Sequence, residues 1–249
     1  MTELRSEWCR LGVGFAVEAA QGPVDPEELI LRSASEGPRD ARLFWGAASW
    51  LKRYGDLVDG RRLRRKLGKD AGSAVLAALV LASESIELKG LLERCQPLRK
   101  PRPLFEVMES TSVLREKVEK GALPEFRRWG LLVDEVSLNL DMLRPASWVL
   151  RQNRNLLVRA LLGANLRADL LDTLLSAKAP LTASDLHRLH GRQYASVHAS
   201  LSALALTNWV ARRQDGNRLF YSVPQDIQDW LEHFPGAEPP AKRRLTRAA

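Results

Sequence analysis

Two groups of side chains have residue types and spacing that could support catalysis or metal binding. Asp134, Glu135 and Asp141 are spaced as metal-binding carboxylates can be, but no Gly-Ser entry to a nucleotide site precedes them. His187 and His190 lie three positions apart, and a zinc site would need further ligands, which are not evident nearby. We therefore expect no catalytic residue, no metal site and no cofactor, and we expect that the protein is not an enzyme.

The two cysteines and the apolar segments bear on the cellular compartment. Cys9 and Cys95 are too few for a disulfide framework or a four-cysteine zinc site, which favours a reducing, cytoplasmic environment. The first residues lack the basic region and cleavage site of a signal peptide. The most apolar run, residues 71–82, is too short for a membrane span of about 20 residues, so we expect no membrane partner.

The charge balance favours a polyanionic partner. The 249 residues include 38 Lys and Arg against 30 Asp and Glu, for a net charge of +8 and a pI near 9.9. Residues 61–128 alone carry +7, and a dense basic cluster there could bind phosphates, although a solvated basic helix is the alternative. The phosphate-binding candidates in this cluster are Arg61, Arg62 and Arg65.

Apolar residues recur at intervals of three and four over most of the chain, which predicts a mainly α fold. Tryptophans at helical spacing to leucines are expected to pack in a core or a dimer interface. We expect the following organisation: an N-terminal helical domain at 1–95, a Pro-rich basic linker at 96–104, a helical connector or dimerisation region at 105–164, a further domain at 165–234 and a basic disordered tail at 235–249.

Local signals follow one another in a fixed order within residues 165–234. A helix at 167–177 precedes a capping box at Thr182 to Asp185 and a short helix that ends at Gly191. A second helix at 193–206 follows, and two short runs rich in aromatic and β-branched residues flank an Asp-Gly turn at 215–217. The order predicts three helices and a β-hairpin.

This stretch, RADLLDTLLSAKAPLTASDLHRLHGRQYASVHASLSALALTNWVARRQDGNRLFYSV, resembles the winged helix-turn-helix domain of bacterial regulators of the ArsR and MarR type. The resemblance implies a C-terminal winged helix with a β-hairpin wing, whose helix at 193–206 enters the major groove of double-stranded DNA. The base-reading candidates are then Gln193, Tyr194, Ser196, His198 and Ser200. The phosphate-binding candidates are Arg192, Arg212, Arg213 and Arg218.

The expected function is that of a sequence-specific DNA-binding transcriptional regulator, a repressor that acts as a homodimer, because one winged helix reads few base pairs. The helix at 193–206 departs from the family by having few long hydrogen-bond donors, which predicts weak base reading. Residues 159–171 also resemble regulators found beside minimal nucleotidyltransferases in toxin-antitoxin operons. The alternative is therefore an antitoxin or scaffold whose main partner is a protein from the same operon.

Residues 39–85 repeat part of the same order, with a helix, a short apolar entry, a basic helix, a glycine and an apolar helix. They could form a degenerate second helix-turn-helix. No hairpin signal follows them, and generic helical packing is the favoured interpretation.

Overall fold

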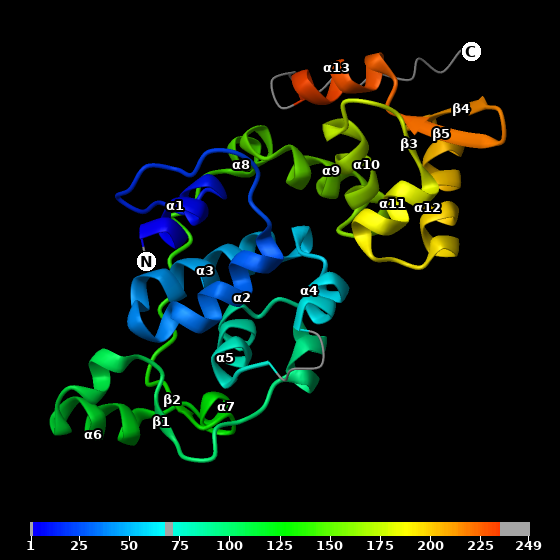
Figure 1. Ribbon diagram of the computed structural model, residues 1–249. Coiled ribbons are helices and arrows are strands. Elements are labelled where there is room, and N and C mark those ends of the chain that lie inside the picture. Colours follow the sequence, from blue (N-terminus) through cyan, green and yellow to red (C-terminus); the bar gives the residue numbers. More distant parts are fainter. Residues whose placement is uncertain (1, 68–71, 235–249) are drawn as a thin grey trace, which may run out of the picture. The chain divides into compact units, whose positions relative to one another are not determined.

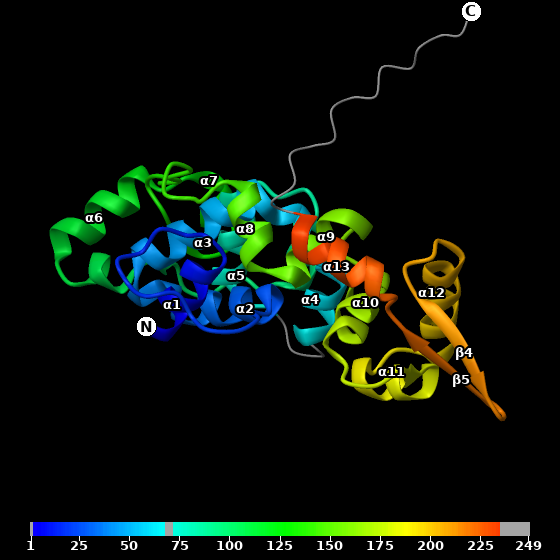
Figure 2. The ribbon, with the colours of Figure 1, turned by 90° about the horizontal axis from the view of Figure 1, so that it is seen from above.

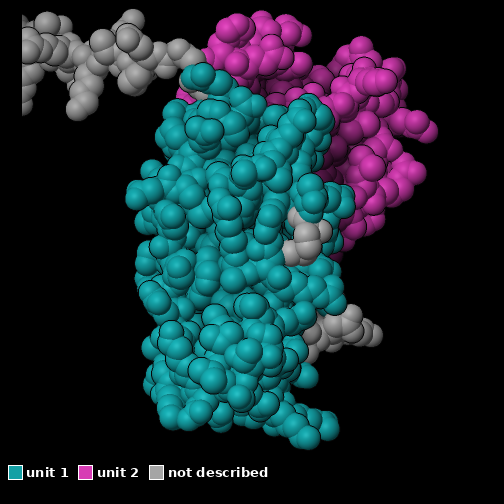
Figure 3. All heavy atoms as spheres, turned by 90° about the vertical axis from the view of Figure 1, so that its left-hand side faces the viewer, with its two compact units in different colours: residues 1–153, 163–165 teal, residues 154–162, 166–249 magenta. Residues whose placement is uncertain are grey.

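The computed structural model describes residues 2–67 and 72–234, and it confirms a mainly helical fold. The chain divides into two compact units, one of residues 1–153 and 163–165 and one of residues 154–162 and 166–249 (Figure 3). The tail expected at 235–249 lies outside the described residues. In the part of the chain that is described, no helix is long and apolar enough to cross a membrane.

The first unit contains a central helix that is buried on all sides, α5 (Ala74–Ser83). Its sequence, AVLAALVLAS, has no polar face, and such a helix is stable only inside a core. The Ser73 hydroxyl caps it by accepting a hydrogen bond from the Leu76 amide at 3.1 Å. The other helices of this unit are α1 (Thr2–Arg10), α2 (Pro26–Glu36), α3 (Ala41–Tyr54), α4 (Gly60–Leu67), α6 (Ser112–Gly121), α7 (Pro124–Arg127) and α8 (Ala146–Gln152) (Figure 1).

Two tryptophans anchor the packing of α1 against α2 and α3. Trp8 and Trp50 are fully buried and meet edge to face, with ring centroids 5.5 Å apart. The Trp8 indole donates to the Ser33 hydroxyl at 2.8 Å, and the Trp50 indole donates to the Leu11 carbonyl at 2.8 Å. Both buried N–H groups are thus satisfied, which confirms the expected core role of these residues.

The Pro-rich segment at 96–104 is extended, as its composition predicts. Within it, Arg102–Pro103 form strand β1, which pairs in parallel with β2 (Leu131–Leu132). The segment therefore lies inside the first unit and does not separate compact units. The boundary between the units falls after Asn153 instead.

The region at 39–85 forms α3, α4 and α5, in the order that the sequence predicts. Its third helix, α5, is buried on every side and offers no exposed face to a nucleic-acid groove. No hairpin follows it among the described residues, since a 3₁₀ segment at Lys89–Arg94 comes next. Generic helical packing accounts for this region.

The described residues of the second unit form five helices and a small antiparallel sheet. The helices are α9 (Arg154–Leu162), α10 (Leu166–Ser176), α11 (Ala183–His190), α12 (Tyr194–Leu206) and α13 (Gln225–His233). The strands are β3 (Leu181–Thr182), β4 (Ala211–Asp215) and β5 (Arg218–Ser222), in the order β3-β5-β4. The helix limits differ by at most one residue at each end from those expected at 167–177 and 193–206.

The core of the second unit draws on every expected element. α12 contributes Val197, Leu201 and Leu204, all buried, at the expected spacings of four and three. β5 contributes Tyr221, and α11 contributes Leu186. Burying an aliphatic side chain of this size stabilises the fold by about 1.5 to 3 kcal/mol, so the three residues of α12 fix which face of that helix points outward.

Candidate nucleic-acid interface

The helix α11, which precedes α12 along the chain, is capped at both ends. The Thr182 hydroxyl accepts from the Asp185 amide at 3.2 Å, and the Asp185 carboxylate accepts from the Thr182 amide at 3.0 Å, which confirms the capping box. Hydrogen bonds to the Asp185 carboxylate, led by the one from the Thr182 hydroxyl, hold the pKa of Asp185 below its usual value. Gly191 ends the helix with a φ of 58°, the left-handed conformation predicted for it.

A chain of aromatic contacts spans the turn between the two helices. His187 Nδ1 meets the main-chain oxygen of Arg192, and the His187 ring lies edge-on to Tyr194 at 6.3 Å between centroids. Tyr194 in turn stacks on His198 at 6.3 Å with an angle of 28° between the rings. These contacts orient the first turn of α12, and no local pattern in the sequence indicates the part played by His187.

The base-reading candidates lie on the outer side of α12. Gln193, Tyr194, Ser196 and His198 are exposed, whereas Ser200 is half-buried. Gln193 occupies the N-cap position but its side chain makes no capping bond. Four of the five candidates are thus exposed, and of these Tyr194 and His198, four positions apart, lie on one side of the helix.

Strands β4 and β5 form the predicted hairpin. Asp215 pairs with Arg218, which leaves a two-residue loop of Gly216 and Asn217. Gly216 has a φ of 56°, a conformation that a side chain would strain. In two views the hairpin lies beside α12 and its tip projects beyond that helix (Figure 2).

The hairpin arginines lie on both faces of the ribbon. Arg212 pairs with Tyr221 in the register, and Arg213 pairs with Phe220, so the two neighbouring arginines point to opposite faces. Arg212, Arg213 and Arg218 are all exposed.

These side chains are also unneutralised. Across residues 2–67 and 72–234, no carboxylate oxygen lies within 4.0 Å of the guanidinium groups of Arg192, Arg212, Arg213 or Arg218. Nor does any of these guanidinium groups donate a hydrogen bond within that part of the chain. Their charges remain available to an external anion.

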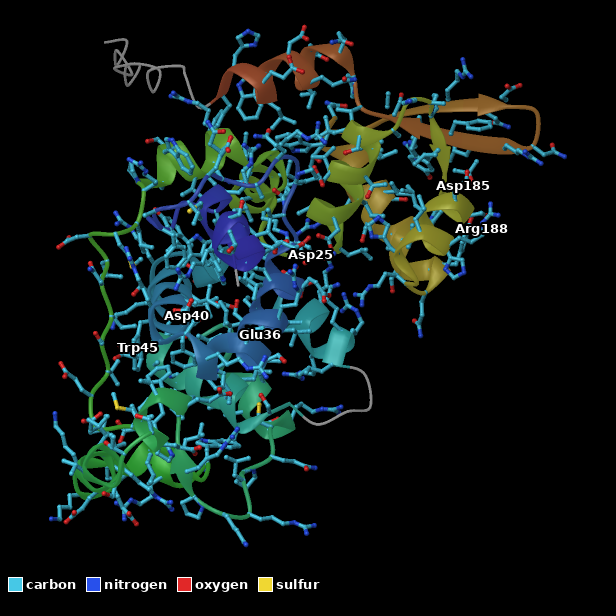
Figure 4. The ribbon with its side chains drawn as sticks, turned by 60° about the vertical axis from the view of Figure 1, so that its left-hand side comes forward. Asp25, Glu36, Asp40, Trp45, Asp185 and Arg188 are labelled. Carbon is cyan, nitrogen blue, oxygen red and sulfur yellow. The ribbon has the colours of Figure 1, made fainter. Side chains whose placement is uncertain are left out.

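A groove of about 440 Å³ separates the hairpin from the two helices. Tyr194 and His198 line it from α12, and Asn217 and Arg218 line it from the hairpin. Arg188 lines it from α11, where its guanidinium donates to Asp185 at 2.6 Å; Figure 4 labels both residues. Arg188 and Asn217 were not among the sequence candidates. The sequence signal that indicates Arg188 is its position as a basic residue on the helix that precedes α12.

The basic candidates of the first unit have a different environment. Arg62 donates to Asp25 at 2.7 Å and to the buried Glu27 at 3.0 Å, and both carboxylates lie at the start of α2 (Figure 4 labels Asp25). Arg65 lies 3.8 Å from Asp59. Arg62 therefore joins α4 to the start of α2, whereas Arg65 pairs with the residue just before its own helix. Both arginines have carboxylate neighbours that compete with a phosphate. Arg61 is exposed and remains a candidate.

The residues first considered for metal chemistry are dispersed. His190 Nε2 lies 2.9 Å from the Thr173 hydroxyl, and His187 contacts a main-chain oxygen, so each imidazole has a structural partner. Asp141 is exposed in the first unit. Among the described residues, no group of three His, Cys, Asp or Glu side chains is arranged to hold a metal ion.

Comparisons of the chain with protein families, with curated proteins and with solved structures found no match.

Proposed function

We propose that the second unit is a winged helix-turn-helix that binds double-stranded DNA, with α12 as its recognition helix and the β4–β5 hairpin as its wing. The observation that carries the proposal is the set of exposed hairpin arginines that lie beside α12 and form no ion pair within the described residues. Cations that project on a hairpin without an ion-pair partner suit a phosphate backbone.

The arginines and the exposed side chains of α12 have separate roles in this proposal. Arg192, Arg212, Arg213 and Arg218 contact phosphates and supply affinity that depends on salt but not on sequence. Gln193, Tyr194, Ser196 and His198 face the major groove, where base edges differ between the four pairs. The groove between α12 and the hairpin is lined by polar and aromatic side chains from both.

We further propose that the protein acts as a homodimeric transcriptional regulator, a repressor in its simplest form. One recognition helix spans only a few base pairs, and two-fold pairing doubles the contacts that discriminate one site from another. The first unit then serves dimerisation or sensing. Sedimentation equilibrium with and without DNA measures the stoichiometry directly.

The test of DNA binding is fluorescence anisotropy of the full chain with the DNA upstream of its own gene and with a scrambled duplex, at several salt concentrations. Replacing Arg212, Arg213 and Arg218 by alanine is expected to weaken binding to both duplexes. The slope of log K against log salt is negative, and its magnitude is also expected to decrease by about 0.9 for each phosphate that is no longer bound.

A matched control removes the same charge from the first unit. Arg99, Lys100 and Arg102 are three exposed cations of the segment at 96–104, and their replacement by alanine is expected to leave the slope unchanged. An equal reduction of slope in both triple variants would show that net charge alone is responsible. Absence of binding to either duplex by the unmodified chain would overturn the proposal and favour a protein partner.

A further inference from the structure

The recognition helix proposed above lacks the side chains that most often read bases by hydrogen bonding. Its sequence, YASVHASLSALAL, contains no Arg, Lys, Asn, Gln, Asp or Glu. Paired hydrogen bonds to guanine from Arg or Lys, or to adenine from Asn or Gln, are therefore not available from within α12. Gln193 alone offers such a group, from the position before the helix.

Methyl groups occupy much of the face that α12 exposes. Ala195 and Ala199 are exposed one turn apart, and Leu206 continues the same side of the helix with 84% of its surface exposed. This side lies opposite the buried Val197 and Leu201. The feature of the major groove that such side chains can contact is the C5-methyl group of thymine.

The hairpin favours the same kind of DNA for an independent reason. The minor groove of A·T-rich DNA is narrow and its negative potential is enhanced, so it attracts arginine side chains. Arg212 and Arg213 are exposed, lie on opposite faces of the ribbon and have no carboxylate within 4.0 Å among the described residues. Each face of the ribbon thus carries an exposed arginine that forms no ion pair within the described residues, although the face of Arg212 also carries the buried Tyr221.

We propose that the protein binds A·T-rich double-stranded DNA in preference to G·C-rich DNA. In this proposal α12 contacts thymine methyl groups, and one of Arg212 and Arg213 enters a narrowed minor groove while the other hairpin arginines contact phosphates. This inference rests on the DNA binding proposed above. It names the substrate class for the same site and assigns Ala199 and Leu206 a part in selecting it.

The test compares four duplexes of one length by anisotropy with the full chain. They are an A·T-rich duplex, the same duplex with every thymine replaced by deoxyuridine, an inosine·cytosine duplex and a G·C-rich duplex. Deoxyuridine removes only the methyl group, whereas inosine removes the guanine amino group from the minor groove. We expect the deoxyuridine duplex to bind at least about fivefold more weakly than its thymine counterpart. We also expect the inosine duplex to bind more tightly than the G·C-rich one.

A variant assigns the methyl effect to α12. Replacing Ala199 and Leu206 by serine removes apolar contact surface from exposed positions, and it is expected to abolish the difference between the thymine and deoxyuridine duplexes. Binding to the thymine duplex is expected to fall more than binding to the deoxyuridine duplex, because only the thymine duplex offers the methyl group. The matched control is Leu189→Ser, at a leucine of α11 with 65% of its surface exposed, which is expected to retain the difference.

The outcomes separate this inference from the function on which it rests. Equal binding to all four duplexes would leave DNA binding intact and overturn the A·T preference. Absence of binding to any duplex would overturn the function itself. If the serine variant bound every duplex more weakly and also had a lower mass in solution, Leu206 would belong to a contact between copies of the chain, and its assignment to thymine would be wrong.

Discussion

The α4 helix and the β4–β5 hairpin are both rich in arginine, but their charges are used differently. In α4, Arg62, Arg65 and Lys66 lie within 4.0 Å of carboxylates. In the hairpin, Arg212 and Arg213 have no such partner among the described residues. The denser cluster in the sequence is therefore the more neutralised one. Whether a basic segment can bind an anion depends on its carboxylate neighbours in space.

The origin of this difference lies in the start of α2. Asp25 caps that helix by accepting from the amides of Glu27 and Glu28 at 3.1 and 3.2 Å, and its side chain also meets Arg62. Burial alone would raise the pKa of Asp25, but Arg62, the main-chain bonds and Lys66 together lower it. Asp25 is thus ionised at neutral pH and binds α4.

The largest expected effect comes from breaking this network at Glu27. Its carboxylate is fully buried, accepts from the Asp59 amide at 2.8 Å and pairs with Arg62. We expect Glu27→Ala to lower the free energy of unfolding of the first unit by about 3 kcal/mol, because it leaves the buried Asp59 amide without its acceptor and removes one of the carboxylates that Arg62 pairs with. Urea denaturation followed by circular dichroism measures this.

The matched control for Glu27→Ala is Glu28→Ala, one position along α2. Glu28 pairs with Lys66 at 2.9 Å, but half of its side chain is exposed, so its removal should cost less than about 1 kcal/mol. Similar destabilisation by both variants would mean that the network is a surface feature and that the α4 cations are free to exchange partners.

A second variant gives an arginine of the hairpin a carboxylate neighbour, as the arginines of α4 have. Gln214 shares a face of β4 with Arg212, and Gln214→Glu places a carboxylate beside that guanidinium. We expect DNA affinity to fall roughly fivefold at low salt, since one phosphate contact is neutralised. Gln225→Glu on α13 makes the same charge change at another exposed position and should alter affinity less. Equal effects would show that the pairing of Arg212 does not matter.

The sequence predicted the second unit more fully than the first. In the second unit, the capping box, the helix end at Gly191, the hairpin turn and the spacing of apolar residues are all local signals, and each is confirmed. In the first unit, Arg62 meets Asp25 and Glu27 across more than 30 positions of sequence. Short-range patterns contain no information on such contacts. The sequence alone therefore predicts phosphate binding by Arg62 and Arg65, and their carboxylate partners become visible only in the structure.

The same reason explains what was missed at the interface. Arg188 reaches the groove only because the hairpin folds back next to α11, and the contact between His187 and Arg192 depends on the turn at Gly191. The helix-turn-helix order could be predicted from sequence, but the lining of its groove could not.

A smaller effect on DNA affinity is expected from removing the carboxylate that pairs with Arg188. Asp185→Asn removes the carboxylate that pairs with Arg188 at 2.6 Å and should strengthen DNA binding about twofold to threefold, with a salt slope steeper by up to about 0.9. Asp226→Asn on α13 is the control of equal charge. Unchanged affinity would mean that Arg188 does not contact a phosphate.

The pH dependence of stability tests the same carboxylate. Because the pKa of Asp185 is lowered on folding, its contribution to stability is present above the unfolded-state pKa and is lost as the pH falls through the folded-state value. We expect the unfolding midpoint of the second unit to fall more steeply with acid in the unmodified chain than in Asp185→Asn. Parallel acid profiles would contradict the assignment of this lowered pKa to the cap.

The smallest expected effect concerns Arg61, the α4 candidate that the ion pairs leave exposed. If spatial pairing decides which cations bind DNA, the carboxylates of Asp25, Glu27 and Asp59 offset the potential around the whole helix, and Arg61 gains little as a phosphate ligand. Arg61→Ala should then leave the salt slope unchanged within error, in contrast to Arg213→Ala. A slope lower by about 0.9 in Arg61→Ala would show that α4 contacts DNA after all. The α4 helix and the hairpin would then both bind phosphates and would differ only in affinity.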